Sequence, residues 1–377
     1  MSRTCALRVA VVGMPWPVET FIDRLLGGLS RAGLDVAIFG SRSPTAEWLE
    51  GGSFSWHPSP WNSPVEVMRS GAWRELPGTA RSIASRRGLG SHDVLYVPWI
   101  NVAAEHPEIF ELGVPVVVSC RGSLIAVAPW NPRRAVLRSA LRRVFDRATA
   151  VHCVADAIAD DAHQLGMPRS KATVIRPAVP IDEYPLTTRR KQTGRLRVIS
   201  IGALNWVKDL ESTLGSIRSA VESGVDAELT IVGDGPDRDR VLFSIGDLGL
   251  DGRVRLAGRL APSEVARELR SHDALLHTSC SEGISNAVLE AMASGLPVVT
   301  TGVGGMAEAV THGVEGYLTP VRDWRSAGEA LAVLANDVPL RRRMGLAARR
   351  RIERDHALEG QVVAFARLLS SSAGRHR

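Results

Sequence analysis

The chain has 377 residues, of which 45% are hydrophobic and 23% are charged. This length predicts two domains, and the composition is ordinary for a soluble globular protein. The formal net charge of +6 suits an anionic ligand or a membrane surface. Because only 5% of the residues are aromatic and the basic residues are spread along the chain, nucleic acid is not an expected partner.

The N-terminal apolar run at residues 9–13 is too short for a secretory signal. No segment has the roughly 18–20 apolar residues that a membrane span needs. Cys5, Cys120, Cys153 and Cys280 form neither a CxxC pair nor a zinc-type spacing. We therefore expect a cytoplasmic protein with reduced, mostly buried thiols.

Short apolar runs alternate with longer amphipathic segments, which is typical of βαβ units around a parallel sheet. In the first half, strands are expected at residues 7–12, 35–40, 94–97, 114–119, 150–154 and 172–176. A helix is expected from about residue 19 to 32, ended by Gly33. Residues 41–78 are rich in Pro, Gly, Ser and Trp and predict loops with a helix or two.

The alternation stops at residues 177–194, where prolines and a polar run indicate a linker. In the second half, strands are expected at residues 196–201, 227–232, 254–257, 274–277, 297–300 and 316–318, and helices at 341–354 and 358–370. The predicted parts are a first domain (1–178), a linker (179–194), a second domain (195–355) and a C-terminal helix (356–377) that packs back on the first domain. Two such Rossmann-like halves form a cleft between them, a favoured place for a ligand.

The most informative stretch is residues 279–299, where seven residues separate Glu282 from Glu290. Glu282 is expected to end a strand, and Glu290 to lie on the following helix. A strand, a Gly-containing turn and a helix N-terminus form an anion site, because the first helical N–H groups are unpaired. Carboxylates beside that site can accept hydrogen bonds from hydroxyl groups. An anion next to a polyol describes a nucleotide sugar.

Two glycine-containing turns in the same half support this interpretation. Gly202 directly follows a strand, so a ligand can approach the backbone, and Lys208 at the start of the next helix can reach a diphosphate. Taken alone, Lys208 would be a solvated surface charge. The turn with Gly233 and the glycine-rich loop at residues 300–308 can present N–H groups to the ligand, but plain strand-to-helix turns explain them equally well.

Other features carry less information. Asp237 and Asp239 match the acid-x-acid pattern of metal-dependent transferases, but acids in a first helical turn are favourable to the helix dipole, so we expect no metal. Gly13 and Arg121 each follow a strand of the first domain and are candidates for the ligand site. Residues 133–147 form a basic amphipathic helix that either covers the sheet or makes a peripheral contact with a membrane.

The chain resembles the retaining GT-B glycosyltransferases of family 4. Residues 282–298 resemble the Glu-x7-Glu signature of this family, residues 202–208 its Gly-…-Lys segment, residues 232–236 its Val-Gly-Asp-Gly-Pro turn, residues 152–184 the end of its N-terminal domain and residues 15–21 its early loop. The resemblance covers nearly the whole chain. It implies an α/β GT-B fold, with two Rossmann-like domains facing each other across a cleft and a C-terminal helix that returns to the first domain.

The resemblance also implies roles for particular residues. Lys208 would hold the donor diphosphate, Glu282 would face the donor sugar and Glu290 would bind the ribose. Backbone N–H groups would cap a phosphate at Gly283, Ile284 and Ser285, while Gly202, Gly13 and Gly233 complete the candidate donor-binding residues. Many members of the family carry a His at the position that ends the strand, which in this chain is the position before Arg121. This chain has Cys120 there, so Arg121 is the expected substitute for the sugar contact.

The implied reaction transfers a hexose-type sugar from a nucleoside-diphosphate donor to a hydroxyl group of a saccharide, a lipid-linked glycan or a small natural product, with no metal or cofactor. Two alternatives remain. One is a nucleotide-sugar-binding protein without activity, against which the intact Lys208, Glu282 and Glu290 argue. The other is a GT-B-like sugar-nucleotide epimerase, for which no acid and base groups are located.

Overall fold

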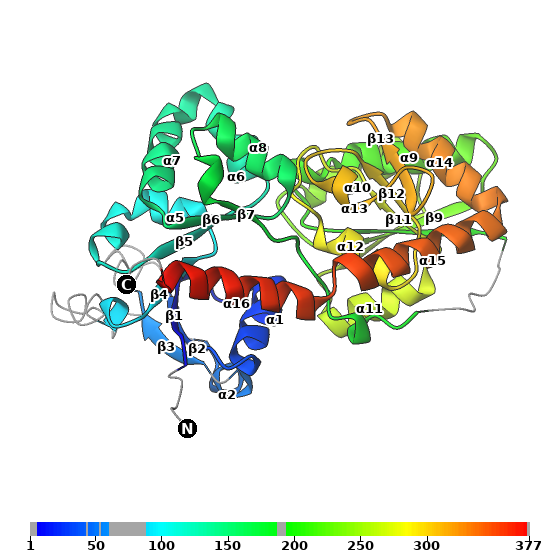
Figure 1. Ribbon diagram of the computed structural model, residues 1–377. Helices are drawn as coiled ribbons and strands as arrows, with labels where there is room; N and C mark the ends of the chain where they lie inside the picture. Colours follow the sequence, from blue (N-terminus) through cyan, green and yellow to red (C-terminus); the bar gives the residue numbers. More distant parts are fainter. Residues whose placement is uncertain (1–5, 43, 53, 60–87, 187–193, 375–377) are drawn as a thin grey trace. The chain divides into compact units, whose positions relative to one another are not determined.

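The structure of the protein is a computed structural model that describes residues 6–42, 44–52, 54–59, 88–186 and 194–374 (Figure 1). The chain forms two compact units. Unit 1 contains Met1–Ile175 and Glu359–Arg377, and unit 2 contains Arg176–Leu358. Residues 187–193 of the predicted linker lie outside the described residues, as do Cys5 and most of the loop region at 41–78.

Unit 1 is built on a seven-stranded parallel sheet with the order β3-β2-β1-β4-β5-β6-β7. Its strands are β1 (Arg8–Met14), β2 (Asp35–Gly40), β3 (Ser55–Pro58), β4 (Val94–Val97), β5 (Val116–Cys120), β6 (Ala150–Cys153) and β7 (Ala172–Val174). β4, β5 and β6 are buried at every position, as expected for strands with helices on both faces. The expectation of loops and helices alone at residues 41–78 is wrong, because the short segment Ser-Trp-His-Pro forms β3. Within the described residues it pairs with β2 alone, at the edge of the sheet.

The helices of unit 1 are α1 (Thr20–Arg31), α2 (Ala46–Gly52), α5 (Ile100–Glu105), η2 (Pro107–Glu111), α6 (Ser123–Ala126), η3 (Ala128–Trp130), η4 (Pro132–Arg134), α7 (Ala135–Arg147), α8 (Asp156–Gln164) and η5 (Arg169–Lys171). The C-terminal helix α16 (Leu358–Gly374) lies alongside α1 (Figure 1). A Cβ added at Gly28 of α1 would lie 2.4 Å from Val362. Phe365, fully buried, packs its ring against Tyr96 and His152. These apolar contacts hold the end of the chain in unit 1.

Unit 2 is built on a six-stranded parallel sheet with the order β10-β9-β8-β11-β12-β13. Its strands are β8 (Leu196–Ile201), β9 (Ala227–Val232), β10 (Val254–Gly258), β11 (Ala274–His277), β12 (Val298–Thr301) and β13 (Gly316–Thr319). Its helices are η6 (Ile181–Glu183), η7 (Trp206–Lys208), α9 (Leu210–Glu222), α10 (Arg238–Asp247), α11 (Pro262–Ser271), α12 (Asn286–Ala293), α13 (Met306–Ala309), α14 (Trp324–Asn336) and α15 (Val338–Asp355).

The strand order of unit 2 reverses between β8 and β11, which are adjacent although four helices and two strands separate them in the sequence. Ligands of open α/β sheets bind at such a reversal, outside the carboxyl ends of the strands. The loops that follow β8 and β11 carry Lys208 and Glu282. The topology therefore brings the two predicted side chains to one edge of one sheet.

Candidate functional site

Hydrogen bonds join the loop after β8 to the loop after β11. The Cys280 N–H donates to the Val207 carbonyl oxygen at 2.7 Å. The Thr278 hydroxyl donates to the carbonyl oxygens of Lys208 and Asp209, at 3.2 and 3.0 Å. Because these bonds replace strand pairing, β11 ends at His277 and Glu282 lies in the loop. The expectation that Glu282 ends a strand is wrong for this reason.

Lys208 ends η7, a single tight turn between β8 and α9. The Asn205 side chain caps this turn by accepting from the Val207 N–H, and Asp209 caps α9 by accepting from Ser212. The Lys208 side chain then runs back over Gly202, where an added Cβ would lie 3.1 Å from the lysine Cε. Gly202 therefore makes room for the lysine, which is a more specific role than letting a ligand approach the backbone.

The Lys208 ammonium forms an ion pair with Glu282 Oε1. The same carboxylate oxygen lies 3.0 Å from His277 Nε2. His277 is the last residue of β11 and is 2% exposed. The Ser279 hydroxyl lies 3.0 Å from the same imidazole nitrogen. These four side chains form a compact cluster at the carboxyl edge of the sheet. Sequence motifs predicted Lys208 and Glu282, but no motif indicated His277 or Ser279.

The cluster has a defined charge state. Burial acts to raise the pKa of Glu282, but the hydrogen bond from His277 and the charge of Lys208 outweigh it and lower that pKa to about 2. Burial, together with the charge of Lys208, lowers the pKa of His277, although its bond to Glu282 opposes this. At neutral pH the cluster thus holds an ionised Glu282 beside a neutral His277. Since a carboxylate only accepts, we assign the imidazole proton to Nε2.

The predicted glycine turns have a packing role. Gly233 has φ +133°, and a Cβ there would lie 1.9 Å from the Gly202 carbonyl oxygen. In the loop after β12, Gly304 has φ +53°, and a Cβ there would lie 1.9 Å from the Glu282 carbonyl oxygen. The Gly305 N–H also donates to the Gly283 oxygen at 2.7 Å. The glycines therefore let neighbouring loops pack backbone against backbone and so hold Gly202 and Glu282 in place.

The start of α12 lies next to Glu282. Ser285 is the N-cap residue, but its side chain forms no capping hydrogen bond, and its N–H faces the Met306 sulfur at 3.4 Å. The Ser281 hydroxyl and the Asn286 side-chain oxygen are buried and have no hydrogen-bond partner within the described residues. Glu290 is the fifth residue of α12 and is partly buried. Buried polar atoms without partners are uncommon, so these two atoms indicate a place beside the start of α12 where a ligand could form hydrogen bonds.

The structure places Arg121 and Gly13 in unit 1. Arg121 follows β5 and donates to the Pro98 carbonyl oxygen and the Tyr96 hydroxyl, both at 3.2 Å. Its guanidinium lies 4.8 Å from the centre of the Phe21 ring. Gly13 lies inside β1, where the pairing with β2 shifts register. Gly13 has φ +80°, and an added Cβ would lie 2.6 Å from Val102. Backbone conformation and packing therefore explain why this position is a glycine.

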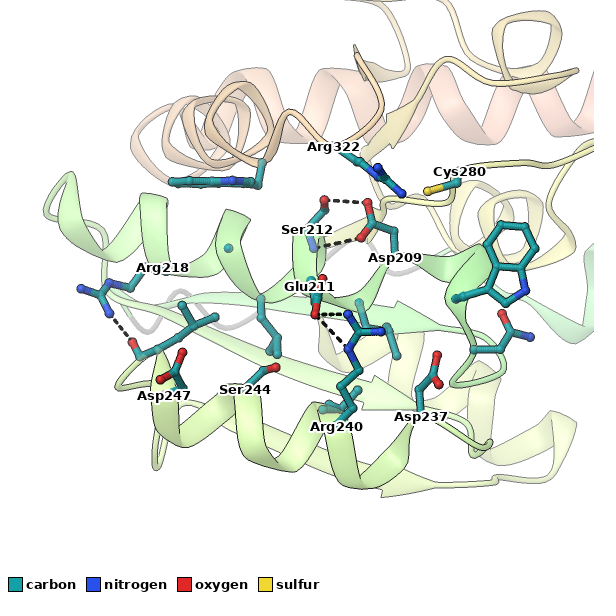
Figure 2. Close-up of a pocket in the computed structure, with 18 residues that line it drawn as sticks. Asp209, Glu211, Ser212, Arg218, Asp237, Arg240, Ser244, Asp247, Cys280 and Arg322 are labelled. Carbon is teal, nitrogen blue, oxygen red and sulfur yellow. Dashed lines mark hydrogen bonds and ion pairs between the residues drawn. The ribbon is translucent and has the colours of Figure 1, made fainter.

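A pocket of about 680 Å³ runs along α9 toward α10 and the start of α14 (Figure 2). The ion pair between Glu211 and Arg240 joins α9 to α10 within it. Asp209 and Cys280 line the pocket, but Lys208 and Glu282 do not. A far smaller cavity of about 10 Å³ is lined by Gly202, Lys208 and His277, among others. Lys208 and Glu282 thus contact each other outside the lining of the larger pocket.

Helix α7 has a basic exposed face. The segment at residues 133–147 contains six arginines and one aspartate. Val136 is 80% exposed, and Leu141, Val144 and Phe145 are buried against the rest of unit 1. In the part of the chain that the structure describes, no helix is both long and apolar enough to cross a bilayer. Within the same part, no three His, Cys, Asp or Glu side chains are grouped as metal ligands would be.

Two family models match the chain. Residues 18–183 match Glycosyltransferase Family 4, and residues 188–351 match Glycosyl transferases group 1. The chain is 28% identical over 282 residues to N-acetyl-alpha-D-glucosaminyl L-malate synthase of Bacillus anthracis, which covers 73% of this chain and 72% of the relative. It is 31% identical over 214 residues to the amylovoran biosynthesis glycosyltransferase AmsK of Erwinia amylovora, covering 54% and 51%. The chain thus spans about half the length of several curated relatives that it matches.

Solved structures show the same fold. Anabaena Alr3699/HepE in complex with UDP and glucose aligns with a TM-score of 0.79 at 18% identity, over 97% of this chain and all of that one. Sucrose-phosphate synthase from Thermosynechococcus elongatus aligns with a TM-score of 0.78 at 15% identity, over 98% of this chain and all of that one. These alignments show that the chain has the GT-B fold, with two Rossmann-like domains. The two matching family models show that the chain belongs to the family 4 glycosyltransferases.

Proposed function

We propose that this protein is a retaining glycosyltransferase that moves a hexose-type sugar from a nucleoside-diphosphate donor to a hydroxyl acceptor without a metal. The observation that carries the proposal is the cluster of Lys208, Glu282 and His277 at the strand-order reversal of unit 2, next to the start of α12. At this site the Lys208 ammonium and the backbone N–H groups before α12 can bind a diphosphate. The Glu282 carboxylate can bind a sugar.

Lys208 supplies the positive charge. Breaking the anomeric bond leaves negative charge on the diphosphate, and preorganised donors and cations stabilise such charge. The chain has three lysines among its 46 basic residues, so an ammonium at this position stands out in an arginine-rich protein. An ammonium is a compact point charge on a flexible stem, which can leave Glu282 and reach a phosphate oxygen. The N–H groups of Gly283 and Ile284, just before α12, can donate to the same phosphate, as N–H groups at a helix N-terminus do.

The two glutamates bind the donor and do not transfer protons. Glu282, with its pKa near 2, is ionised at neutral pH and accepts hydrogen bonds from sugar hydroxyls. Glu290 binds the ribose hydroxyls. The departing phosphate oxygen takes the proton of the acceptor hydroxyl on the same face of the sugar, which retains the anomeric configuration. No protein side chain is assigned as the base.

UDP-linked sugars are the first donors to examine. The aligned structures of Anabaena Alr3699/HepE contain UDP, UDP with glucose, or UDP-glucose. The test is incubation of the full chain with UDP-, GDP-, ADP- and dTDP-sugars and a set of hydroxyl acceptors, in EDTA. We expect acceptor-dependent release of nucleoside diphosphate and a product with the anomeric configuration of the donor, as read by proton NMR.

Variants decide between this function and its alternatives. Glu282→Gln should abolish most of the transfer, whereas Glu228→Gln, which changes a carboxylate paired with Arg195 at the surface, should leave it unchanged. Binding of nucleotide sugars without transfer to any acceptor would indicate a non-catalytic partner protein. Epimerised donor without transfer would indicate an epimerase. An inverted product, or activity that EDTA abolishes, would contradict the mechanism.

The basic face of α7 suits a peripheral contact with an anionic membrane. The six arginines and one aspartate at residues 133–147 attract anionic headgroups, and Val136 and Trp130 (45% exposed) offer apolar contact at the surface. Co-sedimentation should be stronger with vesicles that contain phosphatidylglycerol than with pure phosphatidylcholine, and should weaken with salt and in an Arg142→Glu/Arg143→Glu variant. Equal sedimentation with both vesicles would remove this part of the proposal.

A further inference from the structure

His277 is buried at the end of β11 and contacts Glu282, so any effect it has on a substrate passes through that carboxylate. We infer that His277 is a positioning residue for the donor sugar: it holds Glu282 Oε1 so that the second oxygen of Glu282 keeps its orientation when Lys208 turns to the diphosphate. This inference rests on the function proposed above and names how that site orients the sugar.

The imidazole is itself held firmly. It belongs to β11, whose backbone pairs with β12 through His277 and Thr300. The Ser279 hydroxyl makes a second contact with Nε2 at 3.0 Å. The Ser279 carbonyl oxygen in turn accepts a 2.6 Å hydrogen bond from the Thr301 hydroxyl of β12. The donor to Glu282 is therefore fixed by two strands of the sheet, whereas Lys208 reaches Glu282 with a flexible side chain.

The need for a second donor follows from charge. Glu282 is largely buried, and its side chain is 14% exposed. If Lys208 were the only partner of Oε1, its movement to a diphosphate would leave a buried carboxylate oxygen unpaired, which is costly. With His277 in place, Lys208 can change partners while Glu282 remains ionised and oriented. The two titratable groups that lower the pKa of Glu282 are His277 and Lys208, and the nearby Asp209 faces Ser212 instead.

Three variants test the inference. His277→Leu removes the donor, His277→Gln keeps an N–H near the position of Nε2, and His272→Gln is a matched control. His272 is a buried histidine that precedes the amino end of the same strand, and its Nδ1 lies 2.6 Å from the Glu268 carbonyl oxygen. Circular dichroism and melting temperature identify variants that fail to fold.

Binding separates positioning from general damage. His277→Leu should weaken binding of the intact nucleotide sugar about tenfold or more, by analogy with the loss of groups that orient metal-binding side chains. Binding of the free nucleoside diphosphate should also weaken, because Lys208 would then leave Glu282 Oε1 without a partner, but it should weaken less than binding of the intact nucleotide sugar, which also needs the oriented carboxylate. His277→Gln should recover most of the loss, and His272→Gln should show none. Equal weakening of both ligands, or no rescue by Gln, would overturn the inference.

The pH profile gives a second readout. Loss of the His277 hydrogen bond should raise the pKa of Glu282, so the acid limb of kcat/KM should move to higher pH in His277→Leu. An unchanged acid limb would contradict the inference. If the wild-type chain transfers no sugar at all, the proposed function fails, but nitrogen-15 NMR of the imidazole still tests the positioning. A neutral ring with its proton on Nε2 at pH 7 supports it, and a proton on Nδ1 alone overturns it.

Discussion

Two buried histidines, one in each unit, show how the same residue type can serve different purposes. His152 lies in β6 of unit 1 and is 1% exposed; His277 ends β11 of unit 2 and is 2% exposed. Burial lowers the pKa of both, for His152 to about 3. Both residues belong to parallel strands and are almost fully buried.

Their partners differ in charge. His152 binds the Ser119 hydroxyl at 2.7 Å through Nδ1 and the Ile175 carbonyl oxygen at 2.9 Å through Nε2. The Ser119 hydroxyl also contacts the Tyr96 hydroxyl at 2.9 Å, and this second hydroxyl accepts a hydrogen bond from Arg121. The direct partners of His152 are thus neutral groups. His277 instead faces a carboxylate that a lysine shares. Hydrogen bonds to neutral, buried partners serve stability, whereas an ion pair next to a helix start with unpartnered polar atoms can exchange partners with a ligand.

The largest expected effect concerns the ion pair of Lys208 and Glu282 next to His277. Lys208→Met should lower kcat about 100- to 1000-fold, the usual cost of removing one preorganised group that stabilises developing negative charge. Lys171→Met is the matched control. Lys171 lies in unit 1 and donates to the carbonyl oxygens of Phe145 and Asp146 at 3.0 and 2.7 Å. Steady-state transfer assays measure both, and equal losses would show that the charge of Lys208 has no special role.

The next effect concerns His152 and its neutral partners. Because the pKa of His152 is lowered from its ordinary value to about 3 when folded, its stabilising effect is present above about pH 6.5 and is lost as the pH falls toward 3. Between pH 7 and pH 4 the wild type should lose about 3 kcal/mol more free energy of unfolding in unit 1 than His152→Asn.

Hydrogen exchange of the β6 amides measures the free energy of unfolding of unit 1 separately from that of unit 2. This separation is needed because a chain of two units need not unfold in one step. Transfer activity at neutral pH should be nearly unchanged in those His152→Asn molecules that remain folded. The same acid dependence in wild type and variant would show that His152 does not titrate on unfolding.

The smallest expected effect concerns Arg121 in unit 1. Arg121→Met removes two hydrogen bonds to neutral acceptors and the contact with the Phe21 ring. If Arg121 contacts the transferred sugar or the acceptor, kcat/KM should fall about tenfold, equivalent to roughly 1.4 kcal/mol. Arg169→Met, which changes a largely exposed arginine, is the control. No difference between the two variants would limit Arg121 to packing in unit 1.

Local sequence patterns predicted most of the fold. The alternation of apolar runs and amphipathic segments predicted twelve of the strands that the structure has, because parallel strands covered on both faces are continuously apolar. β3 was missed, since an edge strand with Trp, His and Pro lacks that signature. Lys208 and Glu282 were predicted from their motifs, and their side chains do meet. Their roles with a donor remain predictions.

The sequence contained enough to establish the family, the two parallel sheets and the charged residues of the candidate site, because periodicity and motif spacing are local properties. It did not identify His277, which looked like the last residue of an ordinary strand. Only the pairing of β8 with β11 brings the loop of Lys208 to the loop of Glu282 and places the imidazole beneath both. The same tertiary packing explains Gly202 and Gly233, whose missing side chains make room for Lys208 and for a neighbouring backbone.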